Sequence, residues 1–162
     1  GTPAEILEKV NKQVCANNKA RMFVTVWLGI LEISTGKLMT SSAGHEYPML
    51  CLNGKYEILK DKHGPPVGTF KKAKYTDLEL KLGKGDSIFV YTDGVAEATD
   101  ADNQLFGTER LLDTLNAVSE GTTQQDILKA VRSAVDDFVK DAPQFDDITM
   151  VGLKYFGTEE NK

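Results

Sequence analysis

The apolar and polar positions of the chain change their period along its length, from helical spacing at both ends to strand-like runs between them. Residues 2–5 predict a helix start, because Thr2 can cap, Pro3 suits the first helical position and Glu5 completes a capping box. The apolar positions that follow recur at helical spacing and predict one buried helix face. They are Ile6, Leu7, Val10 and Val14.

The segment from residue 22 to residue 92 predicts a series of strands joined by turns. Residues 22–33 predict a long and mostly buried strand, and a turn at 34–37 leads into a return strand at 38–42. Asn53-Gly54 is the strongest short hairpin signal in the chain. Apolar runs predict the other strands. These are 49–52 and 56–59 around the hairpin turn, then 75–82 and 86–92.

The pattern returns to helical spacing after residue 108. Residues 109–118 predict a helix with Leu111, Leu112, Leu115 and Val118 inward. Thr122 and Gln125 predict a second capping box, opening an amphipathic helix that runs to Lys140, and residues 148–155 predict a closing strand. Hairpin-joined strands favour antiparallel sheets, and helices at both ends favour packing outside them. The expected class is an α+β layer fold.

Length and composition restrict the possible functions. The 162 residues predict one domain, which we place at residues 1–157, followed by a polar tail at 158–162. The net charge of −5 argues against a broad nucleic-acid-binding face or a basic membrane-binding face. No run is long enough to cross a bilayer and no signal peptide is visible. Cys15 and Cys51 stand singly, so we expect free, buried thiols in a reducing cytoplasm.

Two acidic sites stand at the ends of predicted strands. Asp93-Gly94 follows the apolar run that ends near residue 92, and Asp146-Asp147 precedes the last strand. Each pair taken alone is typical of an ordinary turn. Taken together, they suggest carboxylates that converge on one rim, where mutual repulsion favours binding of a cation. Oxygen ligands select a hard ion such as Mg²⁺ or Mn²⁺.

Other polar positions carry weaker signals. His45 ends a predicted strand, and Lys71 and Lys72 belong to a small basic cluster that could meet a phosphate at the rim. A hydrogen-bonded histidine and a solvated lysine face are the simpler interpretations. The sequence holds no nucleophile elbow and no phosphate loop. If the chain performs hydrolysis, a metal-activated water is the expected nucleophile.

Taken in order, several short motifs resemble the bacterial SpoIIE-type serine phosphatases, a branch of the PPM (type 2C-like) superfamily. The resemblance extends from about Pro3 to Lys154, and the Thr-Asp-Gly and Asp-Asp-Ile-Thr elements make it specific. The matching motifs are residues 3–7, 22–25, 42–45, 64–68, 85–86, 91–98, 105–107 and 144–149.

The resemblance implies two antiparallel sheets stacked as a sandwich, helices outside them and a two-metal site at one rim. Asp93 matches a metal ligand of the family, and Asp146 matches its C-terminal metal ligand. Gly94 and Asp147 match neighbouring second-shell or backbone positions. Members of the family remove phosphate from phosphoserine or phosphothreonine, often on small anti-anti-sigma regulators. The same chemistry is therefore expected here, with metal-activated water as nucleophile.

The chain departs from the family at its N-terminus. The family opens with a Gly-Gly-Asp strand whose aspartate bridges both metals, and nothing in the chain matches that strand or the turn that follows it. We therefore expect a C-terminal portion of the domain, with an incomplete metal site and weak or no activity alone. Missing strands would leave open sheet edges, from which we expect self-association.

Three functions stay open at this stage. The first is a metal-dependent protein phosphatase domain, and the second is a phosphatase-like signalling module that binds a phosphoprotein without turnover. The third is a structural domain with incidental acidic turns. Mg²⁺ and Mn²⁺ are not distinguished, because both accept the same oxygen ligands. We expect a cytoplasmic location and no membrane contact by this segment, with a membrane-tethered longer protein as an open alternative.

Overall fold

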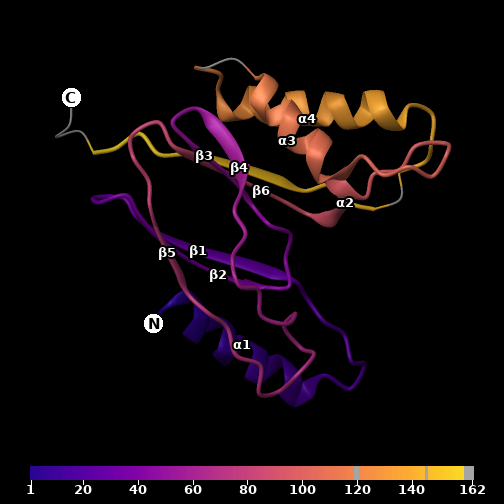
Figure 1. Cartoon of the computed structure of the whole chain (residues 1–162). Helices are drawn as coiled ribbons and strands as arrows, with labels where there is room; N and C mark the ends of the chain where they lie inside the picture. The colour runs from indigo at the N-terminus through magenta and orange to yellow at the C-terminus, as the bar shows by residue number, and fades with distance from the viewer. Residues whose placement is uncertain (119–120, 145, 159–162) are drawn as a thin grey trace. The chain divides into compact units, whose positions relative to one another are not determined.

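The computed structural model describes residues 1–118, 121–144 and 146–158. Its contacts group the chain into two compact units. The first contains Gly1–His45 and Lys60–Gly83 with the residues from Gly157, and the second contains Glu46–Leu59 and Lys84–Phe156. Figure 1 labels the elements. They are α1 (Pro3–Asn17), β1 (Val26–Glu32), β2 (Lys37–Ala43), β3 (Met49–Leu52), β4 (Lys55–Ile58), β5 (Leu78–Lys81), β6 (Ser87–Tyr91), α2 (Asp93–Ala96), α3 (Gly107–Ala117), α4 (Gln124–Val139) and β7 (Met150–Lys154).

The first unit is a three-stranded sheet packed against α1. Its strand order is β1-β2-β5, and both pairings are antiparallel. The predicted capping box opens α1, since the Glu5 N–H donates to Thr2 Oγ1 at 3.3 Å and the Thr2 N–H donates to Glu5 Oε2 at 3.1 Å. The core of this unit joins the helix to the sheet and to the following loops. It consists of Ala4, Leu7, Ala43, Val67 and Tyr75.

The buried face of α1 differs from the predicted one. Leu7 is buried as expected, but Val10 and Val14 are 40% and 37% exposed. Asn11 is buried in their place, and its side chain donates to Phe70 O at 2.8 Å and accepts from the Gly68 N–H at 2.9 Å. A carboxamide that satisfies two loop backbone groups can be buried at low cost. The buried face of α1 therefore contains the polar residue Asn11 in place of Val10 and Val14.

The strand predicted at residues 22–33 is shorter and less buried than expected. The regular strand begins at Val26, and Phe23 is 60% exposed. Val24 makes only an isolated antiparallel bridge to Val67. Within the described residues, β1 pairs with β2 alone and is an edge strand, which explains its partial exposure.

The second unit contains a four-stranded antiparallel sheet in the order β4-β3-β6-β7. The hairpin predicted at Asn53-Gly54 is confirmed, and the two residues have φ values of 52° and 81°. A type I′ turn requires positive φ at both central positions, which asparagine and glycine tolerate. The closing strand β7 pairs with β6, with Phe89 opposite Gly152 and Tyr91 opposite Met150.

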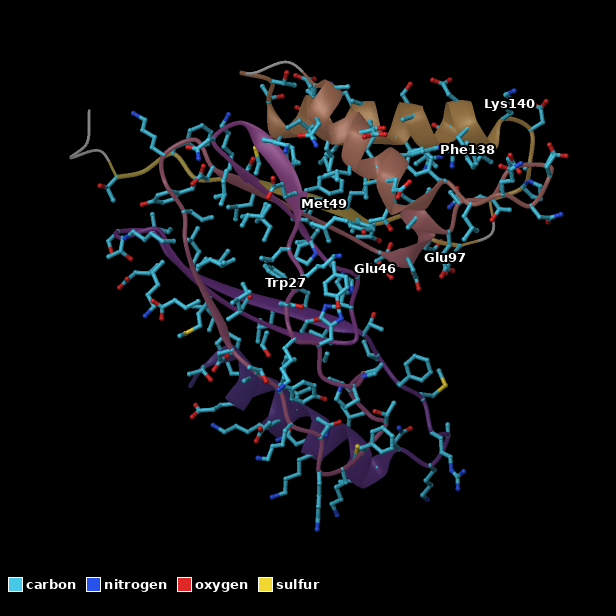
Figure 2. The ribbon with its side chains drawn as sticks, viewed as in Figure 1. Trp27, Glu46, Met49, Glu97, Phe138 and Lys140 are labelled. Atoms are coloured by element: carbon cyan, nitrogen blue, oxygen red, sulfur yellow. The ribbon has the colours of Figure 1, made fainter. Side chains whose placement is uncertain are left out.

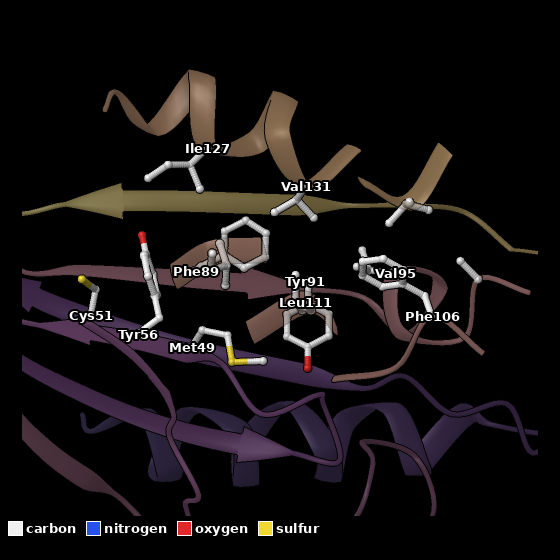
Figure 3. Packing of buried hydrophobic residues seen from close by; sticks show 13 residues of the cluster. Met49, Cys51, Tyr56, Phe89, Tyr91, Val95, Phe106, Leu111, Ile127 and Val131 are labelled. Atoms are coloured by element: carbon white, nitrogen blue, oxygen red, sulfur yellow. The ribbon is translucent and has the colours of Figure 1, made fainter. Parts of the chain in front are cut away.

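Helices α3 and α4 cover one face of this sheet and build the larger core. The predicted inward positions Leu111 and Leu115 are buried. The cap of α4 is one residue later than predicted, because Thr123 rather than Thr122 accepts from the Asp126 N–H, at 3.2 Å. Figure 3 shows the packing of sheet and helix side chains. The sheet contributes Met49, Cys51, Tyr56, Phe89 and Tyr91, and the helices contribute Leu111, Leu115, Ile127, Val131 and Val135.

The structure also bears on the cysteines and on membrane insertion. Both cysteines are free, as predicted, and Cys51 is buried. Cys15 is only partly buried, so the expectation of two buried thiols was wrong for that residue. Among the described residues, none of the helices is long and apolar enough to span a bilayer. Of the predicted tail at 158–162, only Thr158 lies within the described residues.

Candidate functional site

Asp93 stands at the end of a buried strand, where the chain turns into a short helix. Tyr91, the last residue of β6, is 2% exposed, whereas Asp93 is exposed. Thr92 is the N-cap of α2, and Asp93 is its first residue. One carboxylate oxygen of Asp93 accepts from the Gly94 N–H at 3.0 Å. The strand end thus fixes the backbone that carries this carboxylate and leaves its side chain at the surface.

Asp146 and Asp147 lie on the loop that enters β7. The Asp147 N–H donates to Asp146 Oδ1 at 2.7 Å, and the Gln144 side-chain amide donates to Asp146 O at 2.8 Å. Both aspartates are exposed. Phe145, which belongs to the same motif, lies outside the described residues. The Asp146 carboxylate is therefore held by the backbone N–H of the next residue, and the Asp146 backbone carbonyl is held by the Gln144 amide.

Thr92 joins the two acidic segments. Its N–H donates to Thr149 O at 3.0 Å, and its hydroxyl oxygen accepts from the Thr149 N–H at 3.0 Å. The same hydroxyl donates to Asp147 O at 3.1 Å. These three bonds extend the β6–β7 ladder beyond its last strand pair. As a result, the segment carrying Asp93 and the segment carrying Asp146 and Asp147 lie side by side.

Gly94 permits the close approach of these segments. A Cβ atom built at Gly94 would lie well under 3.0 Å from Asp147 O, a separation that real Cβ atoms essentially never show. The backbone of Asp146 is also within 4 Å of that position. Glycine is therefore required here by space, because its φ does not lie in the left-handed region.

The donor set of these segments suits one hard cation. Asp93 and Asp146 present carboxylate oxygens from neighbouring loops, and Mg²⁺ is commonly held by one or two carboxylates with water completing its shell. Within the described part of the chain, no group of three or more histidine, cysteine, aspartate or glutamate side chains is placed to hold a metal ion. The residues present therefore fit a single ion better than the two-metal centre that the sequence motifs imply.

The other predicted site residues belong to the first unit. The His45 ring lies 3.4 Å from Thr25 Oγ1, and Lys71 and Lys72 are exposed. Since Asp93 and Asp146 belong to the second unit, contact of His45, Lys71 and Lys72 with the rim stays a prediction.

Two residues near the acidic segments were not singled out from the sequence. Thr92 is part of the Thr-Asp-Gly motif, but its role depends on a partner 57 residues away that no local pattern indicates. The Gln144 side-chain amide donates to the backbone carbonyl of Asp146, two residues later in the same loop. Tyr91, which precedes this site, has a pKa raised to about 12, mainly because burial disfavours the phenolate, with a further contribution from the charge of Glu46.

Solved structures share this architecture. The PP2C domain of SiaA from Pseudomonas aeruginosa matches with a TM-score of 0.81 and 20% identity, covering 95% of this chain and 60% of that chain. The phosphatase domain of SpoIIE from Bacillus subtilis matches with a TM-score of 0.66 and 14% identity, covering 98% of this chain and 75% of that one. At such identities the likeness shows the fold, which is that of the PP2C-type phosphatase domains.

Sequence relatives then define the family. Residues 1–156 match the family described as Stage II sporulation protein E (SpoIIE), and the chain belongs to it. Protein IcfG of a Synechocystis strain is 37% identical over 134 residues, which are 82% of this chain and 20% of that protein. Phosphoserine phosphatase RsbU of Bacillus subtilis is 30% identical over 98 residues, 59% of this chain and 29% of that protein. The chain thus spans less than a third of either curated relative.

Proposed function

We propose that this chain is a metal-dependent protein phosphatase domain that hydrolyses phosphoserine or phosphothreonine. The observation that carries the proposal is the junction at Thr92, which holds the Asp93 segment against the Asp146 segment. Membership of the SpoIIE family and the name of the relative RsbU, a phosphoserine phosphatase, support the same chemistry.

Each residue of the junction has a distinct role in this proposal. Asp93 and Asp146 hold a divalent cation, Mg²⁺ or Mn²⁺, while Gly94 and the backbone around Asp147 set the spacing of the two loops. When bound, such a cation binds phosphoryl oxygen and lowers the pKa of coordinated water toward neutrality. The Asp147 N–H keeps one oxygen of Asp146 occupied, which leaves the other oxygen to face the ion.

The proposed substrate is a phosphorylated regulatory protein of the anti-anti-sigma type, and the proposed surroundings are the cytoplasm. Resemblance to the SpoIIE-type phosphatases supports this class of substrate. His45, Lys71 and Lys72 are proposed to contact the substrate at the rim. The proposed domain occupies residues 1–157.

A second function is a binding module that holds the phosphoprotein without turnover. Within the residues that the structure describes, no group of three or more histidine, cysteine, aspartate or glutamate side chains is placed to hold a metal ion, which favours this alternative for the isolated chain. One weakly held cation is sufficient to attract a phosphoryl group, whereas positioning a nucleophile as well commonly uses a two-metal clamp.

Titration calorimetry with Mn²⁺ tests the metal site directly. Asp93→Asn and Asp146→Asn should each weaken Mn²⁺ binding by about tenfold or more, because each removes a charged ligand. Asp113→Asn, an exposed aspartate on α3 of the same unit, is the matched control and should bind like the wild type. Equal affinity of all four proteins would refute the assignment of the metal ligands.

Hydrolysis of an aryl phosphate at millimolar Mn²⁺ separates the two functions. Turnover that Asp93→Asn abolishes identifies an enzyme. Mn²⁺-dependent binding of a phosphoserine peptide without any turnover identifies the binding module. If the chain neither binds Mn²⁺ nor turns over the aryl phosphate, both functions fail together.

A further inference from the structure

A cavity of about 180 Å³ opens beside the candidate metal site in the second unit. Gly94 and Asp146 contribute to its lining, and its apolar walls include Ala98, Val135 and Val139. A cavity of about 150 Å³ lined by aliphatic and aromatic side chains holds a molecule of the size of benzene. This cavity therefore has room for one aliphatic or aromatic side chain, and it is too small for most drug-sized ligands.

The charges around the cavity are unevenly matched. Arg132 is paired within α4, with its Nε 2.9 Å from Asp136 Oδ1. Glu97 and Lys140 also line the cavity, from the end of α2 and the end of α4, where Figure 2 labels them. Lys140 forms no salt bridge with any of the described residues. Its ammonium group is thus available to an anion that enters the cavity beside the candidate metal site.

The backbone of Lys140 is held in an unusual conformation. Lys140 caps the C-terminus of α4 with φ 53° and ψ −119°, and its N–H donates to Asp136 O at 2.8 Å. Residues with a Cβ atom rarely occupy this region, and glycine is the usual residue where a helix ends with positive φ. A strained lysine at the mouth of a cavity suggests that its side chain serves a purpose that glycine would not.

We propose that this cavity recognises the phosphoprotein substrate, with an apolar side chain next to the phosphorylated residue inside it. Lys140 pairs with the phosphoryl group of the same segment. Charge complementarity supports this occupant, because Lys140 offers a cation outside the Arg132–Asp136 pair, and the same cavity presents the apolar side chains of Ala98, Val135 and Val139. The inference rests on the proposed function, and it adds a sequence preference that metal chemistry alone does not provide.

The first test measures binding of phosphoserine peptides by fluorescence anisotropy in the presence of Mn²⁺. A peptide with leucine beside the phosphoserine should bind about tenfold more tightly than its alanine analogue, as expected for several methylenes in an apolar pocket. Ala142→Trp, on the lining of the cavity, should abolish this preference by filling the space. Ala117→Trp, an exposed residue at the end of α3, is the matched control and should keep it.

Lys140→Gly tests the second half of the proposal. The variant should bind the phosphorylated leucine peptide about tenfold more weakly, because a charged pair is lost. Its affinity for the unphosphorylated peptide should not change. Its thermal stability should be equal or higher, since glycine accepts the positive φ without strain. Equal loss of affinity for both peptides would overturn the role of Lys140 in phosphate recognition.

Methyl NMR of the wild-type chain separates this inference from the proposed function. N-acetyl-leucinamide, without phosphate or metal, should shift the methyl signals of Val135, Val139 and Ile148, which line the cavity. Selective shifts support the cavity even if no Mn²⁺-dependent turnover is found. Absence of these shifts, or equal affinity for the leucine and alanine phosphopeptides, overturns the recognition pocket even if the enzyme is active.

Discussion

Substitution of Gly94 by alanine tests whether close backbone approach builds the candidate site. The new methyl group would meet the carbonyl oxygen of Asp147 at well under 3.0 Å. Helix propensity alone favours alanine over glycine by about 1 kcal/mol, and overpacking costs about 1–3 kcal/mol. The clash should dominate, because the obstructing atom belongs to backbone that Thr92 ties in place.

The expected net loss is up to about 2 kcal/mol in the free energy of unfolding, or up to about 8 °C in Tm for a chain of this size. Mn²⁺ affinity should fall by about tenfold, since the loop carrying Asp146 must move away from Asp93. Differential scanning fluorimetry and titration calorimetry measure the two effects.

Gly152→Ala is the matched control for this experiment. A Cβ atom at Gly152 would also make a close contact, but with the amide oxygen of the Gln124 side chain, which can rotate away. This variant should keep its Mn²⁺ affinity and lose little stability. Wild-type Tm and wild-type Mn²⁺ affinity in Gly94→Ala would refute the reasoning.

Three further outcomes follow from the structure. Thr92→Val should cost about 0.5–1.5 kcal/mol in chemical denaturation, because the Thr149 N–H and the Asp147 carbonyl lose their hydroxyl partner. Thr92→Ser should recover most of this loss, and an unchanged Thr92→Val would contradict the bridging role. The free energy of unfolding should fall between about pH 10 and pH 12. The unfolded chain releases the Tyr91 proton near pH 10, whereas the folded chain releases it only near the raised pKa of about 12. In Tyr91→Phe, this part of the dependence of stability on pH should disappear. Light scattering should show concentration-dependent association through the edge strands β1 and β7, where Ile30 and Val151 are exposed. Val151→Lys should reduce this association, and a monomer at high concentration would exclude it.

Local signals in the sequence predicted the parts of the fold that depend on local chemistry. The capping box at Thr2 and the turn at Asn53-Gly54 are confirmed because both depend on residues within a few positions of each other. The amphipathic stripe of α4 is confirmed for the same reason, although its cap falls at Thr123. Each of these features depends on residues close together in the sequence, so the packing of distant segments does not decide it.

The misassigned positions are those whose environment comes from distant segments. Val10 fits a helical stripe as well as Leu7 does, and only the loop around Gly68 determines that Asn11 turns inward. Phe23 belongs to an apolar run, but it precedes β1 and is 60% exposed, because burial requires packing partners from distant segments that the run itself does not specify. The acidic sites at Asp93 and Asp146 were found by motif, whereas their meeting through Thr92 and the cavity at Lys140 require the folded sheet.

The pairing of β6 with β7 also has a consequence for biosynthesis. Asp93 and the chain around it leave the ribosome more than 50 residues before Thr149, the residue that precedes β7 and pairs with Thr92. Until Thr149 is available, the Asp93 loop has no backbone to hold it at its final spacing from Asp146. Metal binding should therefore begin only after the last strand has emerged and paired, so a nascent or prematurely terminated chain would lack the site while already containing most of the sheet.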